Sequence, residues 1–458
     1  TYIISVVYWK YKETVFQTLI RRGKKMKKTD IVVLAVSAAV LALSGCSKKE
    51  ASENSINGKI GGTITVLTNR TDIVDTKLQD YKEAFEAKYP GTSVEFEAIT
   101  DYDGTVRTRM STHEYGDVLC RPSIRSVDYA NYFEPLGKSE DFAKVFNFTN
   151  GSNPIDYNGV VYCYPTNGVV GSGILYNKKV FEKAGVAVPR GTEDFYKALE
   201  AIKEKTDAVP IFMNYPAGWT LNQWEGAVSA FSGDKEYKNK IIKQDAPFVP
   251  GNAHYETYKM MYEVVKRGFC ERDMLSSDWE LSKQMCADGK IGCMVLGSWA
   301  IPQIKNLADN PDDIGYMPIP AVVDGDKYAE ASLDMTLCIN KYSKNKATAY
   351  AWIKFFTEDT DWVEFNESIP PKKGGKYPAV LDSFNTMGVT YFEMSKPAPE
   401  DEGVYDTLDK EAEIGFWSEP EKKRIVDAAM GTTSESFDDI MNDWNRRWAK
   451  ARKDNNIK

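Results

Sequence analysis

Residues 63–91, TITVLTNRTDIVDTKLQDYKEAFEAKYPG, predict the fold class of this chain. They begin with a β-rich run, Thr63–Leu67, and continue with a polar loop at residues 68–71. Apolar side chains then recur every three or four positions from Val74 to Tyr89, which predicts an amphipathic helix that ends at Pro90-Gly91. Strand, loop and helix in this order are typical of an α/β fold.

The same pattern continues along the chain. Ser93–Ile99 alternates as a strand, residues 101–110 can form a second helix, and Asp117–Leu119 begins another strand. A further set of strands follows from Val160, with a helix that opens at Thr192. This alternation predicts parallel sheets, in which ligands bind beyond the carboxyl ends of the strands.

The C-terminal part of the chain is predicted to be helical. Thr432 and Glu435 have the spacing of a capping box, and apolar side chains then recur on one face. Trp444 and Trp448 belong to that face. We expect these two tryptophans to pack a helix onto a domain.

A 13-residue apolar run, residues 31–43, follows Met26-Lys27-Lys28 and ends in Leu43-Ser44-Gly45-Cys46. A basic start, a short apolar stretch and a small-residue site before cysteine are typical of a bacterial lipoprotein signal. The alternative, a core helix that ends in cysteine, is disfavoured because the following residues are polar or small and lack periodicity. The run is also too short to cross a bilayer core of about 30 Å.

The lipoprotein interpretation divides the N-terminal part of the chain. We expect residues 1–25 to be translated upstream sequence that is absent from the mature protein, residues 26–45 to be the signal peptide, and residues 46–60 to be a flexible tether. A lipid on Cys46 would then hold the protein at the outer side of the cell membrane.

Composition excludes several classes of partner. Of 58 Lys and Arg and 66 Asp and Glu, residues 1–45 hold eight and two, so the rest of the chain is about fourteen charges negative. A net negative surface disfavours nucleic acid and leaves membrane contact to the lipid alone. About 400 mature residues exceed one hydrophobic core, so two domains are expected.

The cysteines and histidines give no sign of a reactive centre. Six cysteines follow Cys46, none at C-x-x-C spacing, and we favour buried free thiols over disulfides. His113 and His254 are the only histidines and lie far apart in the sequence. We therefore expect no metal, no cofactor and no catalytic residue.

Three segments together resemble a known family. They are GVVYCYPTNGVVGSGILYNKKVFEKAGV at Gly159–Val186, DGKIGCMVLGSWA at Asp288–Ala300, and INKYSKNKATAYAWIKFF at Ile339–Phe356. Their residues, order and spacing are similar to those of the extracellular solute-binding proteins of bacterial ABC importers, specifically the maltose-type sugar-binding family. The resemblance extends from about Gly61 to Trp448.

The resemblance implies a two-lobed α/β fold of the periplasmic-binding-protein type II class, which traps its ligand when a hinge closes. Two crossing segments are expected near residues 166–170 and 328–334, where Asn167-Gly168 and Gly171 can absorb backbone rotation. The expected lobes are residues 61–166 plus 331–395 for lobe 1, and residues 169–328 plus 396–450 for lobe 2.

A sugar presents apolar faces that stack on aromatic rings. Trp299 follows Gly297-Ser298 and matches the family's Gly-Ser-Trp element, whose tryptophan commonly stacks on a sugar; rim packing is the alternative. Trp219 and Trp224 lie in NYPAGWTLNQWEG, where the family places aromatic residues of its binding cleft. Trp417 lies near the family's late cleft tryptophan, offset by about one position.

The first lobe is expected to bind the ligand hydroxyls with polar side chains that follow its strands. These candidates are Asn69, Arg70, Arg121, Ser123, Arg125 and, at the second crossing, Asp334. Two arginines flank one loop, which departs from the carboxylates and amides usual in the family. They indicate an acidic sugar, a bidentate hold on a neutral sugar, or surface charge alone. Asp334 can accept hydroxyl bonds or brace the hinge.

The resemblance implies a monomeric cell-surface lipoprotein that captures a carbohydrate, best an oligosaccharide, and delivers it to an ABC permease without chemistry. A second hypothesis keeps the fold but changes the ligand to an anion, a phosphorylated polyol, a polyamine or a peptide. A third is a secreted glycoside hydrolase, which would require paired carboxylates. Sequence spacing alone does not exclude a hydrolase in a chain this acidic.

Overall fold

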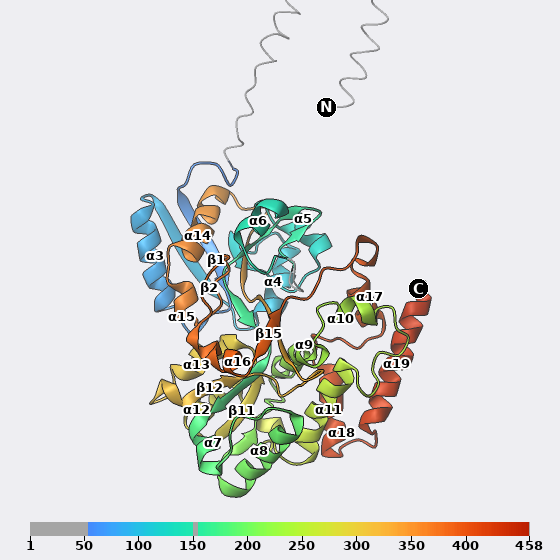
Figure 1. The fold of residues 1–458 in the computed structure, drawn as a ribbon. Helices are drawn as coiled ribbons and strands as arrows, with labels where there is room; N and C mark the ends of the chain where they lie inside the picture. The colour runs from blue at the N-terminus through green and yellow to red at the C-terminus, as the bar shows by residue number, and fades with distance from the viewer. Residues whose placement is uncertain (1–53, 150–153, 458) are drawn as a thin grey trace, which may run out of the picture. The chain divides into compact units, whose positions relative to one another are not determined.

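The computed structural model describes residues 54–149 and 154–457 of the chain (Figure 1). The upstream residues 1–25, the predicted signal peptide and the lipidation site Cys46 lie outside these ranges. The described residues from Lys59 onward form one compact unit, whose strands make four sheets. Among the helices of the described ranges, none has the length and apolar character needed to cross a membrane.

The first lobe is built on a five-stranded sheet. Its strands, in spatial order, are β2 (Thr92–Ala98), β1 (Gly62–Thr68), β3 (Val118–Cys120), β14 (Thr336–Ile339) and β7 (Cys163–Pro165). Helices α3 (Lys77–Lys88) and α14 (Lys346–Glu358) cover it, where Phe85 and Trp352 meet edge to face at 5.2 Å. The predicted opening unit of strand, loop and helix is thus present.

The second lobe is built on a four-stranded sheet, in the order β10 (Val209–Ile211), β11 (Ile291–Leu296), β9 (Gly173–Asn177) and β12 (Ile314–Met317). Helices α7 (Lys178–Ala184) and α8 (Thr192–Lys205) pack against each other beside it. Figure 1 shows α7, α8 and β11 together, apart from α3, β1 and β2. Two lobes therefore form, as the resemblance implied.

The prediction of purely parallel sheets is wrong. β1 pairs in parallel with β2 and β3, but β14 runs antiparallel to β3. In the second sheet, β11 is parallel to β10 and antiparallel to β9. β14 runs antiparallel to β3 because the chain returns from the second lobe and enters the first sheet from the opposite direction.

A small third sheet contains the segments that join the lobes. Strand β8 (Gly168–Val170) connects β7 to β9, and β13 (Lys327–Leu333) leads into β14. β8 and β13 pair antiparallel, with β15 (Val389–Phe392) beside β13. The predicted crossings coincide with these strands, whereas the predicted lobe boundaries stay predictions. Helix α16 (Asp382–Thr386), within the segment assigned to lobe 1, stacks Phe384 on Tyr316 of β12 at 5.3 Å.

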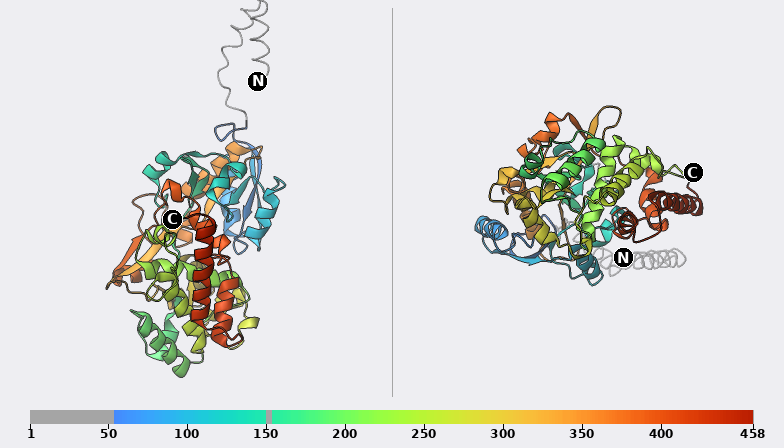
Figure 2. Two further views of the ribbon diagram at one scale, coloured as in Figure 1. Left: turned by 90° about the vertical axis from the view of Figure 1, so that its right-hand side faces the viewer. Right: turned by 90° about the horizontal axis from the view of Figure 1, so that it is seen from below.

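The C-terminal helix α19 (Phe437–Asp454) packs along α17 (Val404–Glu411) and α18 (Pro420–Met430), as Figure 2 shows in dark red. Trp444 and Trp448 are fully buried, which confirms their predicted role. The predicted capping box is wrong by four positions. Ser436 and Asp439 form the box, while Glu435 pairs instead with Arg424.

The remaining elements are short or cover the two large sheets. The helices are α4 (Tyr102–Met110), α5 (Tyr129–Tyr132), α6 (Ser139–Val145), α9 (Ala227–Ser232), α10 (Tyr237–Ile241), α11 (Ala253–Lys266), α12 (Trp279–Ala287), α13 (Ile301–Lys305) and α15 (Trp362–Phe365), and the strands are β4 (Gly137–Lys138), β5 (Asp156–Tyr157) and β6 (Val160–Val161). The six cysteines of the described ranges are free thiols, and all except Cys270 are buried.

Candidate functional site

Two loops of the second lobe meet at one edge of its sheet. β10 and β11 are parallel, with Ile211 opposite Cys293, so their carboxyl ends lie at the same edge. β11 is followed directly by Gly297-Ser298-Trp299, and β10 leads into the 3₁₀ segment η2, Gly218–Gly226. The sheet therefore brings together two parts of the chain that lie about 80 residues apart.

Three tryptophans gather at this edge and are called here the tryptophan cluster: Trp219, Trp279 and Trp299. The ring centroids of Trp219 and Trp299 lie 5.7 Å apart, and Trp279 lies 4.9 Å from Trp219 and 6.1 Å from Trp299. Trp219 keeps 40% of its surface exposed, and the other two are partly exposed. Aromatic surface that is clustered and yet reaches solvent is suited to a ligand with apolar faces.

The Gly-Ser-Trp element explains how Trp299 is presented. A side chain at Gly297 would place its Cβ 2.5 Å from Cδ1 of Trp299, so only glycine lets the indole fold back over the backbone. The Ser298 hydroxyl accepts a hydrogen bond of 3.1 Å from the Val170 amide of β8. The three residues of the element therefore contribute differently, since glycine makes room, serine ties the loop to the crossing strand, and tryptophan faces the edge.

Glu271 supports the other loop from beneath. Its carboxylate accepts hydrogen bonds from the backbone amides of Met213 and Asn214, both at 3.0 Å, where the chain leaves β10. Burial of the carboxyl group raises the pKa of Glu271 to about 7, although the backbone bonds favour its charged form. This buried acid therefore fixes the start of the segment that carries Trp219.

Trp417 is presented on a separate turn against the same segment. Its side chain is 58% exposed, and its backbone carbonyl accepts a hydrogen bond of 3.1 Å from the Asn222 amide of η2. The turn that carries Trp417 and the segment that carries Trp219 are thus joined.

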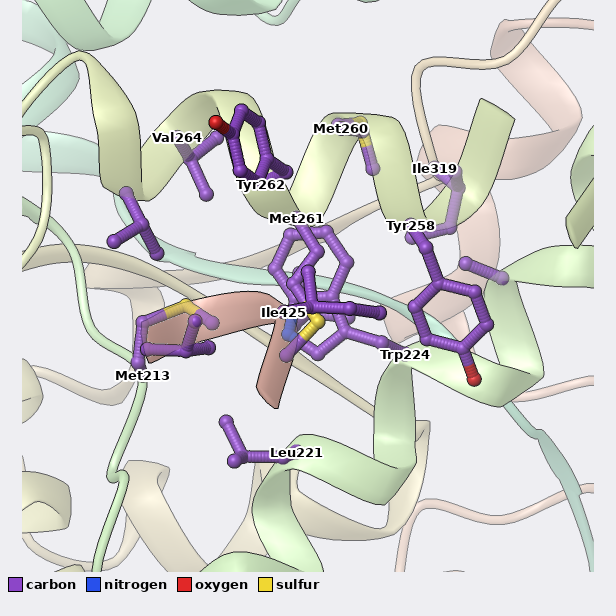
Figure 3. Close-up of a cluster of buried hydrophobic side chains, with 14 of the residues drawn as sticks. Met213, Leu221, Trp224, Tyr258, Met260, Met261, Tyr262, Val264, Ile319 and Ile425 are labelled. Atoms are coloured by element: carbon purple, nitrogen blue, oxygen red, sulfur yellow. The ribbon is translucent and has the colours of Figure 1, made fainter. Parts of the chain in front are cut away.

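Trp224, also predicted as a site residue, is buried, in contrast to the tryptophan cluster. It is 2% exposed and belongs, with Met261 and Ile425, to the hydrophobic core of the second lobe (Figure 3). A 3₁₀ segment has three residues per turn, so Leu221 and Trp224 share the buried face of η2 while Trp219 and Asn222 lie on another. The sequence alone does not show this difference in burial between Trp219 and Trp224, which lie five positions apart.

Charged and amide groups gather at the corresponding edge of the first sheet. Arg121 follows β3 and donates its backbone amide to Thr336 at the start of β14, at 2.9 Å. Asp334 donates its backbone amide to the carbonyl of Asn167, and the Asn167 side-chain amide reaches the Asp334 carboxylate at 3.4 Å. Arg121 and Asp334 therefore both lie at this edge, whereas their contact with a ligand stays a prediction.

Asp334 is exposed to solvent but crowded by protein. The loss of surrounding water raises the pKa of its carboxyl group, and the Asn167 hydrogen bond and the charge of Arg70 only partly oppose this. A carboxyl group of this kind retains free acceptor positions in a partly dehydrated setting, which suits ligand hydroxyls.

Arg70 lies at the same edge but is already engaged. Its guanidinium bonds both carboxylate oxygens of Asp72 at 2.8 Å and Oδ1 of Asn366 at 2.7 Å, and it lies 5.3 Å from the Trp362 ring centroid. Burial would raise the pKa of Asp72, but Arg70, with a contribution from Lys283, holds it below its usual value. Lys283 belongs to α12 of the second lobe, so a charge of that lobe acts on Asp72 of the first.

The other predicted residues of the first lobe face solvent. Arg125 pairs with Asp128 at 3.1 Å and its side chain is 66% exposed. Ser123 is exposed and donates its backbone amide to Asp103, and Asn69 is exposed beside Arg70. Arg121 instead donates to the Tyr129 hydroxyl at 3.2 Å. The two arginines of this loop therefore do not converge on one point.

One ion pair joins the lobes beside the site. Lys305 of α13 donates to both carboxylate oxygens of Glu367 at 2.8 Å. α13 packs on β12 of the second lobe, whereas Glu367 follows α15, which packs on α14 of the first. Side-chain exposures of 20% and 34% show that this pair is partly shielded from water.

Sequence reasoning missed Trp279 and the supporting residues Glu271, Asn222 and Lys305. Asp278 caps α12 through the Leu281 amide and places Trp279 at the first helical position, but this local pattern does not predict which side chains Trp279 meets. In the described ranges, no group of three His, Cys, Asp or Glu side chains is placed to hold a metal. The two lobes thus place aromatic rings at the edge of the second sheet and polar side chains at the corresponding edge of the first.

A family model described as bacterial extracellular solute-binding protein matches residues 70–361. Among characterised relatives, the multiple sugar-binding protein of Streptococcus mutans is 24% identical over 351 residues, which cover 73% of this chain and 79% of the relative.

Two solved structures from Bifidobacterium animalis subsp. lactis are also similar. A binding protein of an ABC transporter in complex with mannobiose is 33% identical, with a TM-score of 0.80 over 86% of this chain and 95% of that chain. A manno-oligosaccharide-specific solute-binding protein in complex with mannotriose is 31% identical, with a TM-score of 0.81 over the same shares, 86% and 95%.

Proposed function

The chain belongs to the bacterial extracellular solute-binding proteins, and we propose that it captures an oligosaccharide between its two lobes for an ABC transporter. The observation that carries this proposal is the tryptophan cluster at the carboxyl edge of the second sheet. The pyranose ring of a sugar has apolar C–H faces that stack on such rings, while its hydroxyls need the donors and acceptors of the opposite edge.

Manno-oligosaccharides are the ligand class that we propose. The two similar structures from Bifidobacterium contain mannobiose and mannotriose and share about a third of their residues with this chain. These ligands are uncharged, which agrees with the engagement of Arg70 by Asp72 and of Arg125 by Asp128. Of the two arginines that flank one loop and indicated an anion site in the sequence, Arg125 already pairs with Asp128 and Arg121 donates to the Tyr129 hydroxyl, so an anionic ligand is the weaker alternative.

The remaining parts of the proposal follow from the sequence. A lipid on Cys46 would keep a monomeric protein at the outer face of the membrane, close to its permease. The protein would release its ligand unchanged, since delivery to a permease requires no chemistry. Export and anchoring are tested by membrane fractionation: Cys46→Ser should move the protein from the membrane to the soluble fraction.

A thermal-shift screen of the purified protein tests the ligand. The panel contains mannobiose, mannotriose, raffinose, stachyose, chitin oligosaccharides and inorganic phosphate. A ligand at 100 times its dissociation constant stabilises the fold by about 2.7 kcal/mol, which gives a clear shift in Tm. We expect the largest shift from mannotriose or mannobiose. A shift with phosphate alone would instead support the anionic alternative.

Two further measurements sharpen this screen. Trp279→Ala should weaken the binding of mannotriose about two- to tenfold, because an aromatic contact beyond area burial is worth about 0.5–1.5 kcal/mol. Replacement of Tyr342, an exposed aromatic residue that stacks on His113 of the first lobe, is the matched control and should leave affinity unchanged. Chromatography after long incubation should recover intact mannotriose. The appearance of shorter sugars would overturn the binding-protein proposal in favour of a hydrolase.

A further inference from the structure

A group of ionisable residues, buried or partly buried, lies beneath the turn that carries Trp417. The group consists of Glu225, His254, Asp409 and Lys422, and is called here the buried ionic group. Glu225 is 4% exposed, and His254 and Lys422 are fully buried. Burial lowers the pKa of Lys422 to about 8, against the attraction of Glu225 and Asp409. Burying charges has a large desolvation cost, and apolar residues often serve stability as well or better.

Lys422 and Asp409 bind the two sides of the peptide unit that joins Gly415 to Phe416, just before Trp417. The Lys422 ammonium donates to the carbonyls of Gly415 and Phe416 at 2.7 and 2.6 Å. The Asp409 carboxylate accepts from the Phe416 amide at 3.0 Å. The backbone N–H and C=O groups of Phe416 therefore both have charged partners, and charge-assisted hydrogen bonds are stronger than neutral ones.

The turn favours glycine at position 415. Gly415 has a φ of +63°, a conformation that strains other residues, and a Cβ there would lie 2.0 Å from the Ser418 hydroxyl, which would have to move. The Ser418 amide closes the turn onto the Gly415 carbonyl at 2.8 Å. The backbone on either side of Trp417 is therefore fixed, although its side chain lies in solvent.

Phe416 anchors this turn in the core of the second lobe. Its ring lies 4.6 Å from the His254 ring and 5.3 Å from the Tyr405 ring. His254 is held in turn by Glu225, whose carboxylate lies 3.1 Å from Nε2 and accepts a hydrogen bond of 2.6 Å from Tyr258. The buried ionic group thus connects the turn to α11 and to the end of η2.

η2 holds the same turn from its exposed side. Asn222 donates to the Trp417 carbonyl, and Gly218 leaves room for the Glu419 side chain, which a Cβ would meet at 1.2 Å. Because η2 also carries Trp219, one segment supports both the tryptophan cluster and the backbone of Trp417. Holding the backbone that carries an exposed indole lowers the conformational entropy that is lost when a ligand binds.

We propose that Lys422 and Asn222 are positioning residues that hold Trp417 as a second aromatic platform for the carbohydrate. The inference rests on the proposed function, because it gives Trp417 a sugar face to contact. Two separate aromatic platforms, both supported by η2, favour a ligand of at least two sugar units over a monosaccharide. Neither residue touches the ligand; each acts through the backbone of the Trp417 turn.

The positioning role is measured first without ligand. The protein is labelled with 5-fluorotryptophan, and Trp417→Phe identifies the ¹⁹F resonance of residue 417. Asn222→Ala and Lys422→Met should shift or broaden that resonance, whereas Gln223→Ala, the neighbouring residue on η2, should leave it unchanged. Asn222→Ala removes only one partly exposed amide and should still fold. It therefore tests the positioning role even if Lys422→Met does not fold. An unchanged resonance in Asn222→Ala would overturn the inference.

Binding of mannotriose is then measured by calorimetry in a double-mutant cycle. Asn222→Ala should weaken binding about three- to tenfold, the effect of one lost hydrogen bond. In a Trp417→Ala background the same change should alter affinity less than about twofold, since the platform is already absent. Equal weakening in both backgrounds would mean that Asn222 acts elsewhere, and would refute the positioning role.

The experiment separates failure of the inference from failure of the proposed function. If Trp299→Ala weakens mannotriose binding but Trp417→Ala and Asn222→Ala do not, the function stands and the second platform is refuted. If the wild-type protein binds no carbohydrate, the proposed function fails, and with it the role of Trp417 as a carbohydrate platform.

Discussion

The two edges that face the site are built from different chemistry. The edge of the second lobe is aromatic, and its tryptophans rest on glycine, backbone amides and a buried acid. The edge of the first lobe is polar, with Asp334, Asn167, Arg70 and Arg121 around the ends of β1, β3 and β7. The edge of the second lobe offers aromatic ring faces for stacking, and the edge of the first lobe offers hydrogen-bonding groups.

This difference suggests a division of labour between affinity and selectivity. Stacking depends on a flat apolar face, which most pyranoses share, so the aromatic edge would tolerate many sugars. Hydrogen bonds depend on the position of each hydroxyl, and an unmatched buried polar group is costly. We therefore expect changes in the second lobe to weaken all ligands together and changes in the first lobe to alter the ranking of ligands.

The largest loss of affinity is expected from Trp299→Ala. A buried tryptophan at the centre of an interface is commonly worth about 2 kcal/mol or more, so the Kd for mannotriose should rise roughly 30-fold. Mannobiose should lose affinity by a similar factor, because the contact does not depend on hydroxyl position. Calorimetry with both sugars measures this, and a loss confined to one sugar would contradict the proposed tolerance of the aromatic edge.

The second prediction concerns how the aromatic edge is held. The pKa of Glu271 is raised from about 4.5 to about 7, so the folded protein binds a proton in this interval that the unfolded chain releases. Stability from this group is therefore greatest below about pH 4.5 and is lost as the pH rises through 7. The shift corresponds to about 3 kcal/mol. Glu271→Gln should remove this slope.

Urea unfolding at a series of pH values between 4.5 and 8 tests the prediction. Subtracting the variant from the wild type cancels groups that titrate alike in both, including Asp409, whose pKa is raised to about 6 by burial. The free-energy difference between the two proteins should change steadily with pH in favour of the variant at high pH. A constant difference would show that Glu271 titrates normally.

The third prediction moves to the polar edge. Asp334→Asn keeps the shape of the side chain but removes its charge and one acceptor, and should weaken a favoured sugar about three- to tenfold. Mannotriose and chitin oligosaccharides differ in the groups that they present, so the two affinities should change by different factors. Because loss of surrounding water raises the pKa of Asp334, wild-type binding should weaken as the pH falls and this carboxyl group takes up a proton, and the variant should not show this decline. Equal factors for all sugars would contradict a selective first lobe.

The smallest effect is expected from Arg125→Ala. Arg125 pairs with Asp128 on the surface, and exposed ion pairs contribute little. Affinity for mannotriose should stay within about twofold of wild type, and affinity for phosphate should remain undetectable. A clear loss would return Arg125 to the site and revive the anionic alternative.

The sequence predicted where the aromatic edge lies better than it predicted which tryptophans belong to it. Trp219 and Trp299 were predicted separately and do meet, because parallel pairing of β10 and β11 brings their following loops together. Trp224 was indistinguishable from Trp219 in the sequence, since a short 3₁₀ segment has too few residues to show its period. Trp279 was missed because its approach to the others depends on the packing of α12, which no local pattern encodes.

The polar edge shows a different limit. Sequence position placed Arg121 after a strand and Asp334 at the second crossing, where both are found, but it could not tell which charged side chains were already paired. Arg70 binds Asn366, almost 300 residues away in the chain, and Arg125 turns to Asp128 instead of the site. Free and engaged side chains look alike in a sequence, because the partner is chosen by the tertiary fold.

The ion pair between Lys305 and Glu367 has a consequence for an uncharged ligand. Its two members belong to different lobes, so a hinge motion that parts the lobes must also separate these charges. Dissolved salt weakens their attraction more as its concentration rises, since the screening length falls from about 10 Å at 0.1 M to about 3 Å at 1 M. Capture of a neutral sugar would then become weaker in concentrated brine, although the sugar itself carries nothing that salt could screen.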